Sequence, residues 1–504
     1  MAQETIDLLI VGGGINGAGI ARDAAGRDLS VLLCDQGDLG GATSSASSKL
    51  IHGGLRYLEN YALRLVHEAL GEREVLLKNA PHLIFPSDFV LPCAKKMRPA
   101  WMLGLGLWVY DHLGGSGKFP ASRAIDLRES KYGDALKDEF EKSYVYTDCR
   151  VDDARLVIAN MRSAQNLGAR ILPRTRCISA WRNGKFWQAT LERSSERIEV
   201  EAKTLVNAAG PWVGSLFNNV IQQRTGHKVR LVKGSHIVIP RPYQGDHAYL
   251  LQNYDQRVVF AIPFQDRFTL IGTTDIPYQG DPAMVSASNS EIEYLCEAVN
   301  GYFRSRIYPS EVVWHYSGVR ALYDDGRPNP SDVSRDYRLI LDTEDTQCLP
   351  LLSIYGGKIT TYRKLAEAAL KLLEPWLSPS KSSWTAQQPL PGGDIPGADF
   401  ERFVAGLQNV YPRFPQVFLR ELALRHGSLV GDVLQDAQET SELGENFGAG
   451  LFGCEVDYFI EHEWARSTED ILWRRSKAGL FLGCAQKQAL ERYVFNKLAQ
   501  AGLR

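Results

Sequence analysis

The hydrophobic positions at the start of the chain form two short apolar runs separated by a helical segment. Residues 7–11, DLLIV, form an apolar run of the kind found in buried parallel strands. The segment 16–28, NGAGIARDAAGRD, is compatible with a helix, and a second apolar run, SVLLC, occupies residues 30–34. The pattern therefore predicts a complete strand–turn–helix–strand unit.

A second helical pattern follows a pair of glycines near residue 356. Residues 355–373, YGGKITTYRKLAEAALKLL, place apolar residues at positions 365, 366, 369, 370 and 373. This spacing predicts an amphipathic helix, with Thr360 or Thr361 as its N-cap. The positive end of the helix would then lie just after Lys358, where it can stabilise a bound negative charge. A glycine loop before a surface helix is the alternative.

The turn after the first strand has the spacing of a dinucleotide-binding fingerprint. Gly12, Gly14 and Gly17 form a GxGxxG arrangement, which permits a tight turn and brings a pyrophosphate to the helix N-terminus. Asp35 lies 23 residues after Gly12, near the ~20-residue spacing of the acid that binds a ribose hydroxyl. With all these parts present, the unit predicts a bound dinucleotide rather than a glycine turn that binds nothing.

Composition and charge are those of an ordinary globular protein. The 504 residues are 44% apolar and 23% charged, with a formal net charge of −2, so we expect two or three domains and no nucleic-acid partner. The eight cysteines include no CxxC pair, which predicts neither a metal site nor a disulfide framework. No apolar run reaches the ~20 residues of a spanning helix, and the N-terminus lacks the basic start of a signal peptide. We expect a reducing, cytoplasmic compartment.

The segment that follows Asp35 is unusual for a nicotinamide-binding enzyme, in which strands and helices would continue to alternate. Residues 37–59, GDLGGATSSASSKLIHGGLRYLE, are rich in Ser, Gly and Thr and show no helical pattern until about Tyr57. Such a segment supplies small side chains and backbone amides that can lie along a ligand anchored by the fingerprint.

Several blocks of the sequence resemble the FAD-dependent glycerol-3-phosphate dehydrogenases, a branch of the D-amino-acid-oxidase-like flavoproteins. The matching blocks are 11–28, 42–59, 205–213 (LVNAAGPWV), 233–241 (KGSHIVIPR), 271–282, 316–325, 334–337, 355–367 and 457–482, in the family's order. One departure is visible, because the family's first signature usually ends Arg-Gly and here Arg27 precedes Asp28. That position ends the first predicted helix, so the difference bears on helix capping.

The resemblance implies a non-covalently bound FAD. The residues expected to contact it are Gly12, Gly14, Gly17, Asp35, Ser44, Ser45, Ser47, Ser48, Lys49, Leu50, His52, Cys177, Ala209, Gly210, Trp212, Gly356, Gly357, Lys358, Ile359 and Thr360. Reduced flavin carries negative charge near its N1 and O2 atoms, which the helix N-terminus after Gly357 would stabilise.

The implied substrate, glycerol 3-phosphate, is small and doubly anionic, so its site requires concentrated positive charge. Arginine suits this role because its planar fork bonds two phosphate oxygens at once. Substrate contacts are expected from Arg56, Tyr57, Thr274, Arg320, Arg335 and Lys358. Each cation taken alone is more often a solvated surface charge.

The implied reaction is oxidation of sn-glycerol 3-phosphate to dihydroxyacetone phosphate, with a hydride moving from C2 to flavin N5. The expected catalytic residues are His236, Arg320 and Lys358. His236, in the strand-like KGSHIVIP, is the first candidate for the base that takes the hydroxyl proton, and His52 is the second. Arg320 would stabilise the alkoxide. A single histidine on a strand is, however, more often only a hydrogen-bonding structural residue.

Residues 95–113, KKMRPAWMLGLGLWVYDHL, join basic residues to an apolar stretch that carries Trp101, Trp108 and Tyr110. The stretch is too short to span a bilayer but suits an interfacial anchor, and equally a core helix with a basic cap. Because the family reduces membrane quinone, the resemblance implies quinone as acceptor and peripheral attachment to the inner face of the cytoplasmic membrane. A homodimer is also compatible.

Three other functions remain open at this stage. An oxidase would pass electrons from the same substrate to oxygen, although such oxidases in this family usually carry an extra insertion that is absent here. An amine or amino-acid oxidase on the same scaffold would need fewer basic residues. A flavin-binding regulator without turnover would not need Arg320, Arg335, Lys358 and His236.

We expect an α/β fold, with α+β character in the substrate domain. A Rossmann-like FAD-binding domain (segments near 1–90, 150–215 and 350–378) would interleave with an antiparallel-sheet substrate domain (near 91–149 and 228–350) in a body of residues 1–387. The stretch 377–399 is rich in Ser, Pro and Gly and predicts a linker. Residues 388–504 predict a helical domain without a catalytic motif, open to capping, dimer contact or partner docking.

Overall fold

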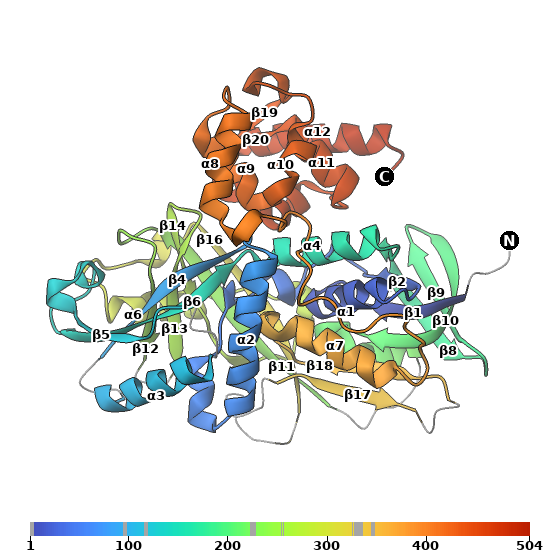
Figure 1. The fold of residues 1–504 in the computed structure, drawn as a ribbon, viewed down its shortest axis with the longest axis horizontal. Helices are drawn as coiled ribbons and strands as arrows, with labels where there is room; N and C mark the ends of the chain where they lie inside the picture. Colours follow the sequence, from blue (N-terminus) through green and yellow to red (C-terminus); the bar gives the residue numbers. More distant parts are fainter. Residues whose placement is uncertain are drawn as a thin grey trace.

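The computed structural model describes residues 5–93, 98–114, 119–221, 228–253, 255, 257–324, 326, 336–343 and 348–503. Within these residues, two β-sheets lie side by side in a body formed by the chain up to about residue 390, and the C-terminal helices pack on top of that body (Figure 1). The predicted α/β fold class with a C-terminal helical domain is confirmed.

The first sheet is built from distant parts of the chain. Across the sheet it contains β17 (Arg338–Asp342), β18 (Leu351–Tyr355), β10 (Glu196–Asn207), β1 (Thr5–Val11), β2 (Val31–Cys34) and β7 (Arg170–Leu172), with β9 (Trp187–Arg193) and β8 (Arg176–Arg182) attached through β10. β1 pairs in parallel with both β10 and β2. Leu8 and Ile10 pack into one core cluster and Leu9 and Val11 into another, so β1 is buried on both faces and its apolar run is explained.

Three helices cover one face of this sheet: α1 (Ile15–Gly26), α4 (Asp153–Asn166) and α7 (Tyr362–Leu373). α1 packs against both of the others. It approaches the end of β1 closely because Gly17 lacks a side chain, and a Cβ there would lie 2.0 Å from the carbonyl oxygen of Gly12.

The end of α1 explains the departure noted at Asp28. The amides of Asp28 and Leu29 donate hydrogen bonds to the carbonyl oxygens of Ala25 and Ala24, which is the pairing of a Schellman C-cap. Asp28 has a φ of +65°, the left-handed conformation in which glycine is the usual residue. The Arg-Asp pair therefore does bear on capping.

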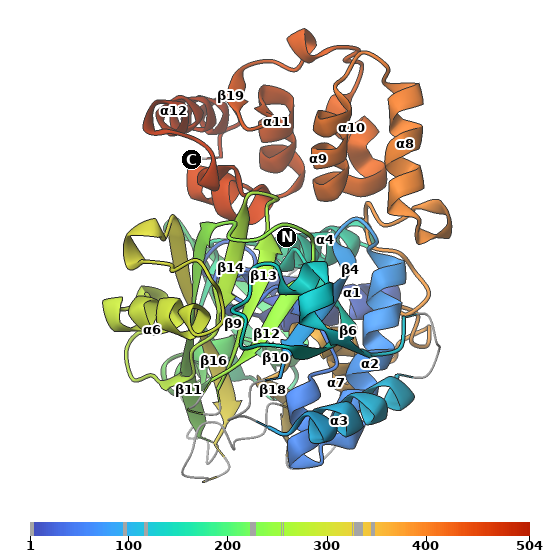
Figure 2. The ribbon, with the colours of Figure 1, turned by 90° about the vertical axis from the view of Figure 1, so that its left-hand side faces the viewer.

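The second sheet is mostly antiparallel. Across the sheet it contains β15 (Ile276–Pro277), β11 (Val229–Pro240), β14 (Phe268–Gly272), β13 (Val258–Phe264), β12 (Ala248–Gln252), β4 (Ile84–Pro92), β6 (Lys142–Val151) and β3 (Leu50–Ile51), with β16 (Trp314–Tyr323) on β11 and β5 (Arg123–Asp126) on β6. The helix α6 (Asn289–Asn300) covers one face, and α2 (Leu63–Asn79) and α3 (Ala100–Leu113) cover the other (Figure 2). A short helix, α5 (Val213–Leu216), follows β10.

The C-terminal helices form a separate core. They are α8 (Phe400–Val410), α9 (Gln416–His426), α10 (Val430–Leu434), α11 (Gly453–His462) and α12 (Cys484–Gln500), together with a small hairpin of β19 (Asn446–Gly448) and β20 (Leu451–Phe452). A π-helical turn, Asp470–Arg475, lies between α11 and α12. Within the described residues, no helix is both long enough and apolar enough to cross a membrane.

The predicted linker, 377–399, is packed against the body rather than extended from it. The indole Nε1 of Trp384 donates a 3.2 Å hydrogen bond to the carbonyl oxygen of Asp23, and the guanidinium of Arg22 lies 5.0 Å from the Trp384 ring centre. Arg22 also donates a 2.8 Å hydrogen bond to the carbonyl oxygen of Gln388. These contacts hold the connection between the two parts against α1.

Candidate functional site

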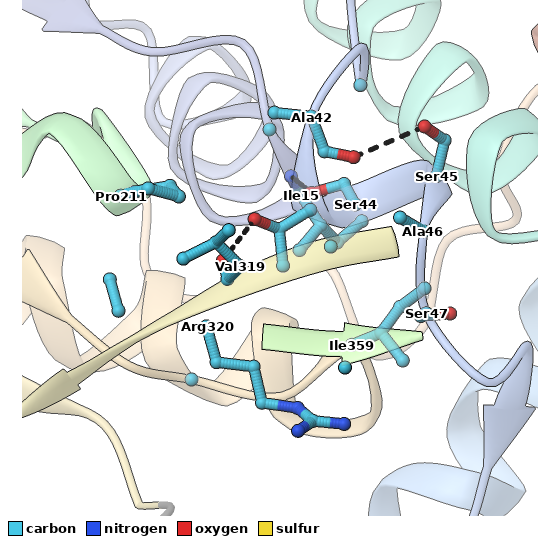
Figure 3. A pocket seen from close by; sticks show the side chains of 18 of the residues that line it. Ile15, Ala42, Ser44, Ser45, Ala46, Ser47, Pro211, Val319, Arg320 and Ile359 are labelled. Atoms are coloured by element: carbon cyan, nitrogen blue, oxygen red, sulfur yellow. Dashed lines mark hydrogen bonds between the residues drawn. The ribbon is translucent and has the colours of Figure 1, made fainter. Parts of the chain in front are cut away.

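A cavity of about 1340 Å³ lies between the two sheets, at the carboxyl end of β1. Its walls come from the turn before α1, the loop 35–48, the residues after β10, strand β16 and the turn before α7. Figure 3 shows Ala42, Ser44 and Ala46 of the loop on one side of β16, near Val319, and the Arg320 side chain on the other side of that strand. The carboxyl ends of parallel strands are where open α/β sheets bind ligands, so the cavity lies where the fingerprint predicts.

The fingerprint glycines serve two purposes. Gly12 and Gly14 line the cavity, and Gly12 has a φ of +120°, with an added Cβ only 2.3 Å from the carbonyl oxygen of Ala208. Gly17 does not line the cavity but supports it through the close packing of α1. The amide of Ile15 donates a 2.9 Å hydrogen bond to Ser44 Oγ. The N-terminus of α1 thus faces the cavity beside a hydroxyl group, an arrangement suited to a phosphate.

Asp35 also lines the cavity, at the end of β2. Its carboxylate accepts hydrogen bonds from the amides of Gly13 (2.6 Å) and Gly37 (2.7 Å). Burial raises the pKa of Asp35, and the two amides oppose that effect by stabilising the charged form. The acid is therefore fixed beside the glycine turn, where the predicted ribose contact requires it.

The small residues of the loop line the cavity, but Lys49 does not. Ser44, Ser45, Ser47, Ser48, Leu50 and His52 are cavity residues. The Lys49 ammonium points to the other side, where it contacts both carboxylate oxygens of Asp153 (2.8 and 2.9 Å) and the carbonyl oxygen of Ser45 (2.9 Å). The Lys49 side chain therefore holds the loop from behind and does not face the cavity, so it does not support the predicted contact of Lys49 with the cofactor.

The opposite wall contains the other predicted cofactor residues, Cys177, Ala209, Gly210, Trp212, Gly356, Gly357, Lys358, Ile359 and Thr360. Gly356 and Gly357 have φ values of +70° and +95°, so this turn depends on residues without a Cβ. Thr361 occupies the N-cap position of α7, but its side chain makes no capping hydrogen bond. Thr360 Oγ1 instead accepts a 3.2 Å hydrogen bond from the amide of His52, which joins the two cavity segments.

Two of the cations predicted to bind the substrate lie in the cavity wall. Arg320 and Lys358 both line it, and the Lys358 ammonium lies 3.5 Å from the centre of the Tyr57 ring. Arg320 Nη1 is 2.5 Å from Asp275 Oδ1, and Asp275 lines the cavity as well. Asp275 was not among the residues predicted from the sequence, although its place beside Thr274 in the block 271–282 is a signal that could indicate it. Two other predicted substrate residues are not described: Arg335 lies outside the described residues, and so does the side chain of Arg56.

The two candidate bases occupy different positions. His52 lines the cavity, and burial, followed by the charges of Lys358 and Arg73, lowers its pKa to about 3. His236 lies behind the cavity wall, where Nε2 shares a 2.9 Å hydrogen bond with Ser48 Oγ and the ring stacks on Tyr316. Burial, and then Arg320 and Lys49, hold the pKa of His236 well below its ordinary value. Both imidazoles are therefore neutral.

Thr274 is not a cavity residue, contrary to the expected substrate contact. It is buried, and its hydroxyl donates a 3.0 Å hydrogen bond to Glu291 while accepting a 2.9 Å bond from the amide of Ser235. The side chain therefore supports β11 from the α6 side of the sheet. Its neighbours Thr273 and Asp275 are the ones that reach the cavity.

One part of the cavity wall comes from the C-terminal domain, a position that the sequence patterns do not predict. Five residues around the π-helical turn line the cavity: Ser467, Glu469, Asp470, Trp473 and Arg474. They belong to the block 457–482 that matched the family, but that block carries no chemical motif to indicate a place in the site.

Comparisons with known proteins agree with this architecture. Residues 7–363 match the family described as FAD dependent oxidoreductase, and residues 383–499 match the C-terminal domain of alpha-glycerophosphate oxidase. A glycerol-3-phosphate dehydrogenase of Pseudomonas aeruginosa is 50% identical over 496 residues, which cover 97% of this chain and 95% of that protein. A D-erythritol 1-phosphate dehydrogenase of Brucella abortus is 47% identical over 495 residues, 98% of each chain. The X-ray structure of the glycerol-3-phosphate dehydrogenase from Bacillus halodurans complexed with FAD is similar at a TM-score of 0.80 and 28% identity, covering 100% of this chain and 92% of that one.

Proposed function

The chain belongs to the FAD-dependent oxidoreductase family, and on that premise we propose that it oxidises sn-glycerol 3-phosphate to dihydroxyacetone phosphate with FAD held in the cavity between its sheets. The observation that carries the proposal is the 50% identity, along 97% of the chain, to the dehydrogenase of Pseudomonas aeruginosa.

The cavity residues fit a dinucleotide. The cavity volume of about 1340 Å³ exceeds the ~300–1,000 Å³ of ordinary small-molecule pockets. An elongated cofactor and a small substrate can therefore share the cavity. The N-terminus of α1 and the hydroxyl of Ser44 suit a pyrophosphate, and Asp35 suits a ribose hydroxyl. Gly12, Gly356 and Gly357 would leave room for the remaining length, since glycine has no side chain to fill the cavity.

When bound, FAD supplies the acceptor for the hydride that leaves C2 of the substrate. Arg320 and Lys358 would bind the phosphate dianion and orient C2 in the cavity. Asp275, paired with Arg320, orients the guanidinium and offers an acceptor to a polyol hydroxyl. The N-terminal end of α7 adds positive potential at the same wall.

The hydroxyl proton requires an acceptor, and the pair of Ser48 and His236 can provide one. Ser48 lines the cavity and is bonded to His236 Nε2. Ser48 would take the substrate proton while its own proton passes to the neutral imidazole. Burial and then the charges of Arg320 and Lys49 keep the pKa of His236 low, and a bound phosphate would offset part of the effect of those charges.

The His236→Asn variant tests this route. Because a positioned base contributes ~10²–10⁴-fold, we expect kcat to fall about 100-fold or more with KM little changed, and the pH profile of kcat to flatten. His52→Asn serves as the comparison, since His52 is the other candidate. An unchanged pH profile in His236→Asn with a flattened one in His52→Asn would assign the proton to His52.

A second substrate deserves direct comparison because the Brucella abortus relative, 47% identical along 98% of the chain, is a D-erythritol 1-phosphate dehydrogenase. The decisive assay is anaerobic bleaching of bound flavin by sn-glycerol 3-phosphate, D-erythritol 1-phosphate, glycerol and a D-amino acid. We expect glycerol 3-phosphate to give the highest kcat/KM and glycerol to give none. Bleaching by neither phosphate would refute the dehydrogenase assignment, and rapid hydrogen peroxide formation in air would favour the oxidase.

We also infer that the electrons pass to a membrane quinone through a peripheral attachment at α3. Trp101, Leu105 and Trp108 are 70%, 55% and 58% exposed and follow one another at helical spacing, while Leu103 and Leu107 are buried on the opposite face. An exposed aromatic and apolar face of this kind suits the membrane interface. The basic residues Lys95 and Lys96 of the predicted anchor lie outside the described residues. The homodimer remains a prediction, which sedimentation analysis would test.

Vesicle flotation tests the attachment. The double variant Trp101→Ser, Trp108→Ser should lose most of its binding to vesicles of bacterial lipid and its quinone reduction, while flavin bleaching by substrate continues. Trp181→Ser is the matched control, because Trp181 is 48% exposed on the distant strand β8. Equal flotation of the double variant and the control would rule out α3 as the anchor.

A further inference from the structure

The segment around the π-helical turn Asp470–Arg475 reaches from the C-terminal core down to the cavity. Its cavity residues lie in the same wall as Asp38, which follows the ribose-binding candidate Asp35, and as Arg174, which follows β7. A part of the chain more than 430 residues from the fingerprint thus closes the dinucleotide end of the cavity.

Asp38 is the first attachment point. It is 6% exposed, and its two carboxylate oxygens accept hydrogen bonds from Arg475 at 2.5 and 2.7 Å. Arg474 Nε donates to the same carboxylate. Arg475 is fully buried and also donates to the carbonyl oxygen of Glu463 near the end of α11. The loop after β2 is therefore tied to the core of the C-terminal domain by a bidentate, buried ion pair.

Asp470 is the second attachment point. Arg174 Nη2 lies 2.6 Å from its Oδ2, and the amide of Arg174 donates a 2.8 Å hydrogen bond to the carbonyl oxygen of Gly37. Burial alone would raise the pKa of Asp470, but Arg475, Arg474 and Arg174 outweigh it and lower that pKa to about 2. The carboxylate is therefore charged wherever the protein is folded at ordinary pH.

Trp473 carries the contact to the second sheet. Its ring stacks on Trp314 of β16, with centroids 4.4 Å apart and an interplanar angle of 15°. Both indoles line the cavity. The segment therefore bridges both walls of the cavity, one through ion pairs and the other through a stacked aromatic pair.

We propose that the C-terminal domain is a retaining clamp for FAD, closed over the dinucleotide end of the cavity by Asp38 with Arg474 and Arg475 and by Asp470 with Arg174. This inference rests on the FAD binding stated under the proposed function. Release of the cofactor then requires the 467–475 segment to lift from the loop 36–41. By reciprocity, bound FAD holds the segment down.

The test uses the full-length holoenzyme and the double variant Arg174→Gln, Arg474→Gln, whose side chains are 39% and 18% exposed and whose loss leaves Arg475 in place. The first readout is the rate at which free-flavin fluorescence appears after the holoenzyme is diluted so far that released FAD does not rebind. The second is hydrogen exchange of residues 467–475, with and without FAD. Arg420→Gln is the matched control, because its pair with Glu401 lies within the C-terminal domain and away from this cavity.

We expect FAD release to accelerate roughly tenfold or more in the double variant, because charge-assisted hydrogen bonds that hold the site closed are lost. In the control, the rate of release should remain unchanged. Exchange of 467–475 should rise in the variant and fall when FAD binds the wild type. Release at the wild-type rate from a folded double variant overturns the clamp while leaving the enzyme assignment intact. Wild-type protein that binds no FAD overturns the cofactor assignment and the clamp together.

Discussion

Replacement of Lys49 by Met separates the two roles considered for this residue. The sequence predicts that Lys49 contacts the cofactor, whereas the structure pairs its ammonium with Asp153 behind the loop. The Lys49 and Asp153 side chains are 5% and 0% exposed, so neither group has water to replace a lost partner. Methionine keeps most of the volume and removes the charge, which leaves a buried carboxylate whose remaining donors are the amide and hydroxyl of Ser47 and the amide of Ala154.

The expected cost follows from that geometry. Breaking a buried ion pair by removal of one partner costs about 3–5 kcal/mol, because the other charge stays buried and uncompensated. An exposed pair is worth only ~0–1 kcal/mol. Lys203→Met therefore provides the matched control, since Lys203 pairs with Asp7 at 2.7 Å but is 51% exposed. The prediction is a loss of stability in Lys49→Met several times larger than in Lys203→Met.

The assay is thermal and urea unfolding of both variants, followed in the same samples by flavin content and by KM for the substrate. Lys49→Met should lower the unfolding midpoint by roughly 5 °C or more, and the folded protein should still bind flavin. The combined variant Lys49→Met, Asp153→Leu should recover part of the loss, because it removes both charges. A Lys49→Met protein as stable as the control but with weakened flavin binding would refute the structural argument and restore the contact predicted from the sequence.

Three further outcomes follow from the structure. Gly12→Ala should abolish flavin binding, because its Cβ would lie 2.3 Å from a backbone oxygen, whereas Gly71→Ala, with open space around it on α2, should retain flavin absorbance. Asp28→Gly should melt at a higher temperature than Asp28→Ala, because both lose the carboxylate but only glycine relieves the φ of +65°. The folded-state pKa of Asp470, about 2, lies below its ordinary 3.8, so the stability it contributes is present above pH ~4 and is lost as pH falls toward 2. Acid unfolding of Asp470→Asn should therefore be flatter in that range, and identical acid profiles would contradict the assigned ion pairs.

The features that sequence patterns predicted well are local ones. The apolar run of β1, the glycine turn and Asp35 are close in sequence, and their spacing is imposed by the βαβ unit itself. The spacing of the α7 helix is likewise set by 3.6 residues per turn. These elements lie where the chain's own periodicity places them, and the cavity forms at their ends.

The side-chain directions were not predictable in the same way. Lys49 has a φ of +56°, a conformation that a strand-like pattern does not indicate, and it turns the side chain toward Asp153. His236 lies on the same face of β11 as Gly234, which lines the cavity. However, Ser48 from a loop distant in sequence lies between His236 and the cavity. The contact between Asp38 and Arg475 joins residues 437 apart in sequence, and no local pattern records such a pairing.

The interleaved order of the first sheet has a consequence for biosynthesis. β1 is complete after 11 residues, its neighbour β10 ends at Asn207, and β18, which pairs with β10, ends only at Tyr355. While the chain emerges from the ribosome, the edge of β10 that pairs with β18 therefore stays unpaired for some 140 residues, because strands β11 to β16 of the second sheet are synthesised in between. Slow translation of that interval prolongs the exposure of the buried end of β10, so synthesis speed and chaperone supply should affect the yield of folded protein.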